Sequence, residues 1–144
     1  MLDAYLYGGK RSAFGRHGGV MARVRPDDML GSVIRDAIAD TAFKGEDFDD
    51  VIIGCGNQAG EDSRCVARHA GLLAGLPIEV PGQVIQRNCA SGLSAIIAAA
   101  HATTVGEGDL FIAGGVESMT RAPTVVGKSE TAFSTKIDAY DSAI

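Results

Sequence analysis

The chain has 144 residues, a formal net charge of −5, 46% hydrophobic and 22% charged residues. This length and composition are typical of a soluble globular domain with a core of its own, and the acidic balance, without a block of lysine and arginine, argues against a nucleic-acid surface. No apolar stretch approaches the ~20 residues of a membrane helix, no signal peptide opens the chain, and the odd cysteine count suits a reducing compartment. We therefore expect a cytoplasmic protein that binds neither membranes nor nucleic acids.

Apolar runs alternate with helical periodicities along the chain. Four strands are expected, over residues 2–7, 51–53, 81–86 and 110–113. Three helices are expected between them: one beginning at Pro26 and ended by Lys44, one capped by Asp62 or Ser63, and one running from Cys89 to about Val105. The order β-α-β-α-β-α-β predicts an α/β fold, with a mostly parallel sheet covered by helices on both faces.

The third predicted helix is unusual because almost no charged residue interrupts its apolar surface. Alanines alternate there with Leu93, Ile96 and Ile97. A helix that is apolar on all sides requires burial on all sides. We expect two sheet layers to enclose it, although the predicted strands supply only one layer.

The chain changes character after residue 116. Residues 117–144 are polar, contain few large apolar side chains and show no clear period. We therefore place a domain boundary here, with an α/β domain over 1–116 and the start of a second, incomplete subdomain over 117–144.

Cys89 is the main candidate for a reactive residue. It lies where a β-branched stretch stops and a helix begins, followed by the small residues Ala90, Ser91 and Gly92. A helix N-terminus favours a thiolate, and its free N–H groups can stabilise an oxyanion. The alternative is a buried cysteine that only packs, as most free cysteines do. Cys55 and Cys65, the latter expected inside the second helix, are interpreted as structural.

A general base for Cys89 is not evident from the sequence. His17 falls in a loop and His69 in the second helix, whereas His101 lies about 16 Å along the third helix from its start. Each is interpreted as an ordinary histidine. The residues therefore predict an incomplete catalytic set.

Two phosphate-binding patterns are rejected. Residues 54–59 (GCGNQA) fit a loose dinucleotide-binding pattern, but the helix does not open within the glycines. Gly127-Lys128-Ser129 resembles the end of a P-loop, but no strand precedes it and no apolar helix follows it.

Six segments, in order, resemble motifs of the N-terminal part of thiolases, the acyl-CoA C-acyltransferases that cleave or form 3-oxoacyl-CoA. They are residues 11–16 (RSAFGR), 25–28 (RPDD), 56–62 (GNQAGED), 73–77 (LAGLP), 88–92 (NCASG) and 114–119 (GGVESM). Together they cover nearly the whole chain. Further segments resemble the 3-oxoadipyl-CoA thiolases, namely 59–62, 66–68, 121–123, 127–128 and 132–134.

The resemblance implies that Cys89 is acylated by a thioester and that its own N–H helps to hold the thioester oxygen. It implies thiolytic cleavage of 3-oxoacyl-CoA, or the reverse condensation, through an acetyl-cysteine intermediate, with 3-oxoadipyl-CoA giving succinyl-CoA and acetyl-CoA. It also implies acyl-CoA and CoA as substrates, no metal or redox cofactor, and a homo-oligomer, dimer or tetramer. Alternatives are an acetoacetyl-CoA thiolase, a ketoacyl synthase, which predicts two downstream histidines and no GGxESM loop, and a non-catalytic α/β module.

Thiolases also use a Gly-His-Pro histidine, a Cys-x-Gly-Gly-Gly cysteine and an Asn-Glu-Ala-Phe asparagine. None of these three segments occurs in the printed sequence. The resemblance therefore implies a chain that stops within the loop domain, before the second half of the fold. We expect these 144 residues alone to be inactive.

Overall fold

The computed structural model describes residues 2–143. Its α-helices are α1 (Pro26–Ala39), α2 (Val66–Ala74) and α3 (Ser91–Val105), and its short 3-10 helices are η1 (Gly45–Asp47) and η2 (Met119–Arg121). Its strands are β1 (Asp50–Gly54), β2 (Gly82–Ile85), β3 (Phe111–Gly115), β4 (Thr124–Val126) and β5 (Ala139–Asp141).

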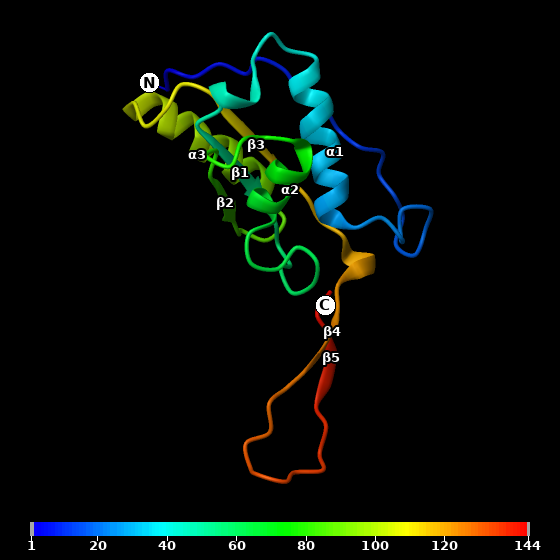
Figure 1. The fold of residues 1–144 in the computed structure, drawn as a ribbon. Coiled ribbons are helices and arrows are strands. Elements are labelled where there is room, and N and C mark those ends of the chain that lie inside the picture. Colours follow the sequence, from blue (N-terminus) through cyan, green and yellow to red (C-terminus); the bar gives the residue numbers. More distant parts are fainter. Residues whose placement is uncertain (1, 144) are drawn as a thin grey trace.

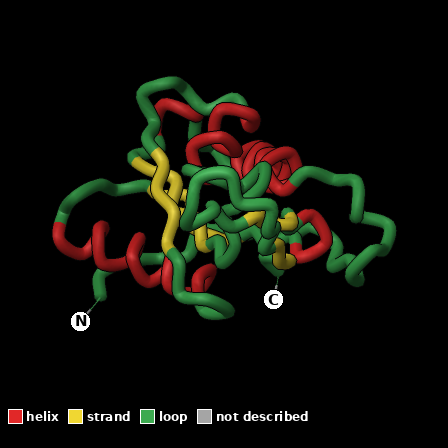
Figure 2. The backbone as a smooth tube through the Cα atoms, turned by 90° about the horizontal axis from the view of Figure 1, so that it is seen from below, coloured by secondary structure: helices red, strands yellow, loops and turns green. Residues whose placement is uncertain are grey.

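The body of the molecule is a parallel sheet with helices on both faces (Figures 1 and 2). The strand order is β2-β1-β3, and β1 pairs in parallel with both neighbours. Val51 and Ile53 of β1 pack in the core cluster formed with α1 and α2, whereas Ile52 packs against α3 on the other face. All three are 1% exposed, because alternate side chains of a central strand enter opposite layers. The α/β fold and the parallel sheet are thus confirmed.

The predicted strand over residues 2–7 is wrong. This segment is extended but has no ladder partner, and its one long-range hydrogen bond joins the Asp3 N–H to Thr104 Oγ1 of α3. Tyr5 and Leu6 are exposed. Apolar patterning alone does not make a strand, because the backbone groups require a neighbouring strand. The sheet of residues 2–143 therefore has three strands rather than four.

The helix limits differ from the predictions at two places. α1 starts at Pro26 as expected but ends at Ala39, before Lys44. α2 starts at Val66 rather than near Asp62, because Arg64 has a φ of 69°, which a right-handed helix does not allow. Cys65 consequently precedes the helix instead of lying inside it.

α3 has one buried face and one exposed face. The alanines Ala95 and Ala99 lie against the sheet, and their small size lets the helix approach it closely. On the opposite side Leu93 is 63% exposed and Ile97 is 41% exposed. The two-layer enclosure expected from the sequence does not form within residues 2–143, since a single sheet covers a single side.

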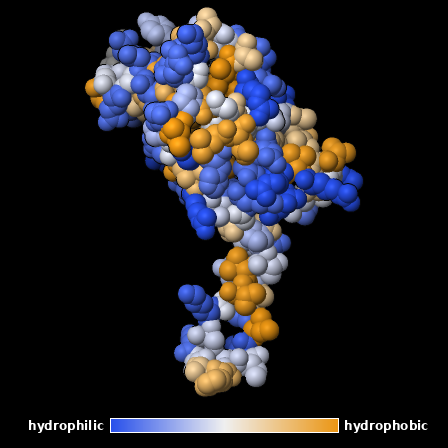
Figure 3. Space-filling model, in the orientation of Figure 1, coloured by the Kyte–Doolittle hydropathy of each residue, from blue (hydrophilic) through white to orange (hydrophobic). Residues whose placement is uncertain are grey.

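The C-terminal part forms a hairpin, residues 122–143, which extends away from the body (Figure 1). Its strands β4 and β5 pair in antiparallel fashion. Apolar side chains are exposed on it, as Figure 3 shows, including Val126, Ile137 and Tyr140. The domain boundary after residue 116 stays a prediction. Within the described residues, no helix has the length and apolarity needed to cross a membrane.

The exposed stripe on α3 predicts self-association of the 144-residue chain. Replacing Leu93 and Ile97 by lysine removes the apolar contact and adds charge, so we expect self-association to weaken at least about tenfold. Analytical ultracentrifugation measures this. Ile78→Lys is the matched control, since Ile78 is 73% exposed but lies in a loop away from α3. Equal weakening by the control variant would contradict the prediction.

Candidate active site

Cys89 lies in a cavity of about 480 Å³ at the carboxyl edge of the sheet. Because β1, β2 and β3 are parallel, the loops that follow them meet at this edge. The lining residues come from all three loops and from the end of the hairpin: Gly54, Gly56, Asn57, Asn88, Cys89, Ser91, Gly92, Gly115, Val116, Glu117, Met119, Ser142 and Ala143. The cysteine loop and the glycine loop after β3 thus share one cavity.

The start of α3 reaches the strand ends because two residues there lack side chains. A Cβ on Gly54 would lie 2.2 Å from the carbonyl carbon of Ser91, and a Cβ on Gly115 would lie 3.2 Å from the Cα of Gly92. Real Cβ atoms essentially never come as close as the first distance, and the second is tighter than nine in ten real Cβ contacts. These two glycines therefore allow the first turn of α3 to rest on the ends of β1 and β3, with Cys89 beside it.

A tight turn joins β2 to α3 and carries Cys89. The N–H of Ala90 donates to the Arg87 carbonyl (3.0 Å), and the N–H of Ser91 donates to the Asn88 carbonyl (3.1 Å). Ser91 Oγ donates to the same Asn88 carbonyl (2.7 Å) and accepts the N–H of Arg87 (2.8 Å). The N–H groups of Gly92 and Leu93 have no acceptor within the helix and point toward the end at which Cys89 lies, whereas the N–H of Ser94 donates to the Ala90 carbonyl (2.9 Å). Cys89 is exposed and is therefore not buried among residues 2–143.

Glu117 connects two of the loops around the cavity. Its carboxylate accepts the backbone N–H groups of Gly56 (2.7 Å) and Asn57 (3.2 Å). The side-chain amide of Asn57 in turn donates to the carbonyl of Ser142 at the end of the hairpin (2.7 Å). Sequence reasoning missed both roles, since contacts between residues 60 to 85 positions apart have no local signal.

Cys55 is buried beneath the cavity. Its thiol donates to the Asn57 carbonyl (3.4 Å) and contacts a carboxylate oxygen of Asp62 (3.9 Å). Burial, together with the negative charges of Glu117 and Asp62, raises the pKa of Cys55 to about 12. Cys55 is therefore unreactive, as its structural interpretation requires. Cys65 is half-buried, with its sulfur 3.2 Å from the Gly82 carbonyl.

None of the three histidines lines the Cys89 cavity. His17 borders a second cavity, of about 610 Å³, between the N-terminal loop and the residues after β3. His69 lies on α2 and His101 is exposed on α3. The structure thus brings no histidine of residues 2–143 to the nucleophile.

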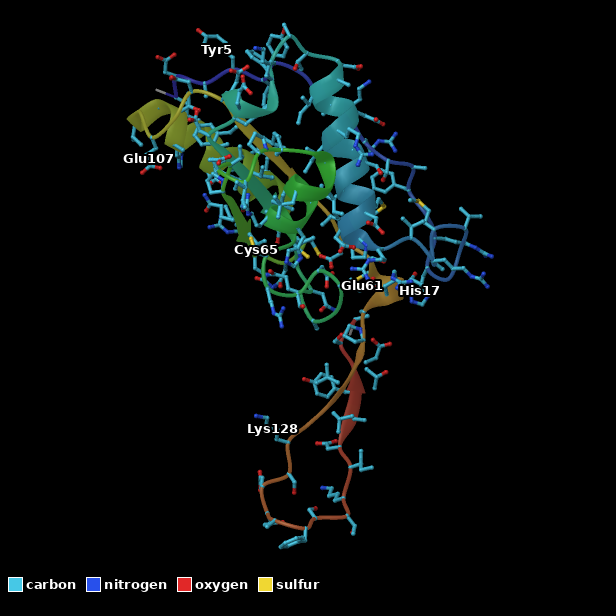
Figure 4. All side chains as sticks on the ribbon, in the orientation of Figure 1. Tyr5, His17, Glu61, Cys65, Glu107 and Lys128 are labelled. Carbon is cyan, nitrogen blue, oxygen red and sulfur yellow. The ribbon has the colours of Figure 1, made fainter. Side chains whose placement is uncertain are left out.

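A chain of ion pairs ties the cavity loops to the start of α1. Arg121 forms a two-pronged pair with Glu61, and Arg25 forms another with Asp27 and lies 3.7 Å from Glu61. Figure 4 shows Glu61 at the end of the body from which the hairpin extends. Arg121 holds the pKa of Glu61 below its usual range. Burial opposes ionisation of Asp27, but Arg25 outweighs it and lowers the pKa of Asp27 as well.

The exposure difference between the cysteines predicts selective alkylation. At pH 8 a thiol with a pKa of about 12 is about one part in ten thousand thiolate, and Cys55 is also 1% exposed. We expect iodoacetamide to modify Cys89 at least about 100-fold faster than Cys55, as measured by peptide mass spectrometry. The urea-unfolded chain is the control, in which both should react. Comparable rates in the folded chain would contradict the burial of Cys55.

The close approach of α3 predicts that Gly54→Ala is strongly destabilising. Its methyl group would collide with the backbone of Ser91, so we expect a loss of at least about 2 kcal/mol in the free energy of unfolding. Urea denaturation measures it. Gly92→Ala lies on the other side of the same contact, where a Cβ would meet only atoms at 3.8 Å or beyond. That variant should be neutral or gain up to about 1 kcal/mol from helix propensity.

The ion pairs predict a stability difference that depends on pH. Because the pKa of Glu61 is lower in the folded chain, its contribution is complete above the unfolded value of about 4.3 and is lost as pH falls through the folded value. Glu61→Gln should therefore destabilise the chain more at pH 7 than near pH 3, as thermal unfolding would show. Glu79→Gln is the control, since Glu79 forms no ion pair among the described residues. A Glu61→Gln effect that persists unchanged at pH 3 would contradict the linkage.

Comparison with known proteins shows the family of the chain. Residues 4–141 match the family model described as "Thiolase, N-terminal domain". The 3-oxoadipyl-CoA/3-oxo-5,6-dehydrosuberyl-CoA thiolase of Escherichia coli K12 is 50% identical over 145 residues, covering 100% of this chain and 36% of that protein. The beta-ketoadipyl-CoA thiolase of Acinetobacter baylyi is 52% identical over 135 residues, covering 92% of this chain and 33% of that protein.

A solved structure gives the same result. The crystal structure of the Bacillus anthracis acetyl-CoA acetyltransferase superposes with a TM-score of 0.80 at 31% sequence identity, covering 88% of this chain and 32% of that one. The chain therefore spans about a third of the length of the proteins that it matches. From the motifs, the fold and these matches together, the chain belongs to the thiolase family, of which it represents the N-terminal domain.

Proposed function

We propose that this chain is the nucleophile-bearing part of a thiolase that cleaves 3-oxoadipyl-CoA with CoA. The observation that carries the proposal is the position of Cys89, exposed in a cavity at the start of α3. The substrate class comes from the relatives, which are named as 3-oxoadipyl-CoA and beta-ketoadipyl-CoA thiolases at about 50% identity.

The chemistry divides into two transfers. The Cys89 thiolate attacks the 3-oxo carbonyl carbon, and the bond between C2 and C3 breaks with its electron pair leaving on C2. Protonation of that carbanion gives acetyl-CoA, while the remaining succinyl group stays on the sulfur as a thioester. The thiolate of free CoA then attacks this thioester and releases succinyl-CoA and the Cys89 thiolate.

This balance corrects the acetyl-cysteine expected from the resemblance. With 3-oxoadipyl-CoA, the group left on Cys89 after cleavage is succinyl, and acetyl-CoA is the first product. The same succinyl-cysteine forms in the condensation direction, whereas an acetyl-cysteine belongs to acetoacetyl-CoA as substrate. Mass analysis of the trapped intermediate therefore distinguishes the two substrates.

The described residues supply part of this machinery. Cys89 is the nucleophile, and the N–H groups at the first turn of α3 stabilise the oxyanion that forms in each transfer. Within residues 2–143, neither a histidine nor a second cysteine lines the cavity to act as the base for Cys89 or the proton donor for the carbanion. We assign these roles to the histidine and cysteine segments of the family that lie outside the printed sequence. CoA takes part as a substrate, and the reaction requires no metal or redox cofactor.

An acetoacetyl-CoA thiolase is the second candidate, favoured by the structural match to an acetyl-CoA acetyltransferase. Both candidates use Cys89 in the same way and differ in the acyl group. For the whole protein we propose a homo-oligomer, supported by the apolar side chains exposed on α3 and on the hairpin. We propose a cytoplasmic location because all three cysteines are free thiols.

Acylation of Cys89 tests the proposal. The 144-residue chain is incubated with succinyl-CoA or acetyl-CoA, and the adducts are located by peptide mass spectrometry. We expect a thioester on Cys89, abolished in Cys89→Ala and retained in the control Cys65→Ser, and no steady-state thiolysis of 3-oxoadipyl-CoA. Acylation that persists in Cys89→Ala, or its absence in the unmutated chain, would overturn the assignment of Cys89. Steady-state thiolysis by the 144-residue chain would contradict the assignment of the base and the proton donor to segments outside this sequence.

A further inference from the structure

The backbone in front of Cys89 adopts a conformation that most residues avoid. Asn88 has a φ of 47°, in the left-handed region, whereas Cys89 is not among the residues with positive φ. The hydrogen bond from the Ala90 N–H to the Arg87 carbonyl closes a four-residue turn around the pair. A positive φ at the second residue of such a turn is the type II′ pattern, which favours glycine or asparagine there.

The side chain of Asn88 is fixed as well. Gln86 donates from its amide nitrogen both to Asn88 Oδ1 (3.1 Å) and to the Gly56 carbonyl (3.2 Å). This links the cysteine turn to the loop after β1, which lines the same cavity. The Asn88 carbonyl is held at the same time by Ser91. Asn88 is therefore constrained through its backbone and through its side chain.

We propose that Asn88 is a positioning residue for Cys89: its left-handed conformation aims the sulfur so that the carbonyl it attacks lies against the N–H groups of α3. The proposal rests on the proposed function, in which Cys89 attacks a carbonyl. It assigns to Asn88 no contact with the substrate. Its physical basis is that the backbone conformation of the residue before the nucleophile sets the direction in which the nucleophile's side chain points.

Two reagents separate positioning from mere exposure. p-Nitrophenyl acetate acetylates the thiolate: the sulfur bonds to the carbonyl carbon through an oxyanion, p-nitrophenolate leaves, and the thiol proton passes to the buffer. Iodoacetamide alkylates the same sulfur, with iodide leaving and no oxyanion formed. The ratio of the two rates at Cys89 therefore reports its placement relative to the oxyanion-stabilising N–H groups. Neither reagent depends on binding of CoA.

The backbone requirement predicts a specific pattern of rescue. Glycine adopts positive φ freely, but alanine does so at a cost. We expect Asn88→Gly to keep the rate ratio within about twofold of the unmutated chain, and Asn88→Ala to lower it at least about fivefold. Gln86→Ala, which leaves the left-handed residue in place, should lower the ratio by an intermediate factor.

Phe133 supplies a matched control for backbone strain. It also has a positive φ, of 60°, but lies fully exposed on the hairpin. Phe133→Ala and Phe133→Gly should leave the rate ratio at Cys89 unchanged. Circular dichroism tests whether each variant is folded. If Asn88→Ala is unfolded, the comparison of the rate ratios in Asn88→Gly and Gln86→Ala tests the positioning role instead.

The outcomes distinguish this proposal from the proposed function. The positioning role would be overturned if Asn88→Ala and Asn88→Gly gave equal ratios of the acetylation rate to the alkylation rate. If Asn88→Ala is unfolded, it would be overturned by equal ratios in Gln86→Ala and Asn88→Gly. A fall of the acetylation rate and the alkylation rate by the same factor would also overturn it, because only the exposure of Cys89 would then have changed. If the ratio follows the expected pattern but acyl-CoA leaves Cys89 unmodified, the positioning role stands and the acyltransferase assignment fails.

Discussion

The candidate site depends on one steric constraint, the contact between the start of α3 and the ends of β1 and β3. A side chain on Gly54 or Gly115 would occupy the space that the helix backbone needs. Because glycine has no side chain at those positions, the helix end and the cysteine turn lie directly over the carboxyl edge of the sheet. The cavity, the exposure of Cys89 and the direction of the helix N–H groups all follow from this approach.

Much of the body could be predicted from the sequence because its signals are local. Apolar runs identified β1 and β3, a β-branched stretch identified β2, and Pro26 marked the start of α1. The strand expected over residues 2–7 failed because pairing is a property of two segments, and the pattern of one says nothing about its neighbour. The start of α2 failed because the left-handed backbone at Arg64 has no signature in an arginine.

The site could be predicted only in its centre. Cys89 was evident because a strand-to-helix junction is a local pattern with a chemical meaning. Its surroundings were not, since Glu117 meets Gly56 and Arg121 meets Glu61 only after the sheet has formed. The pattern of charges along the sequence indicated neither of these two contacts, because each partner alone resembles an ordinary surface residue. The resemblance to thiolases located the loop of Glu117 but could not supply the hydrogen bonds that the carboxylate makes.

The order of the strands also bears on synthesis of the protein. β1 is central, yet both of its neighbours follow it in the chain, and Gly54 pairs with a residue about sixty positions later. During translation the nucleophile leaves the ribosome before β3, so its cavity still lacks a wall at that moment. The apolar β1 must wait for partners that arrive late, an interval in which nascent chains are prone to aggregate and chaperones bind. The edge of the sheet that carries Cys89 is thus among the last parts of this body to be assembled.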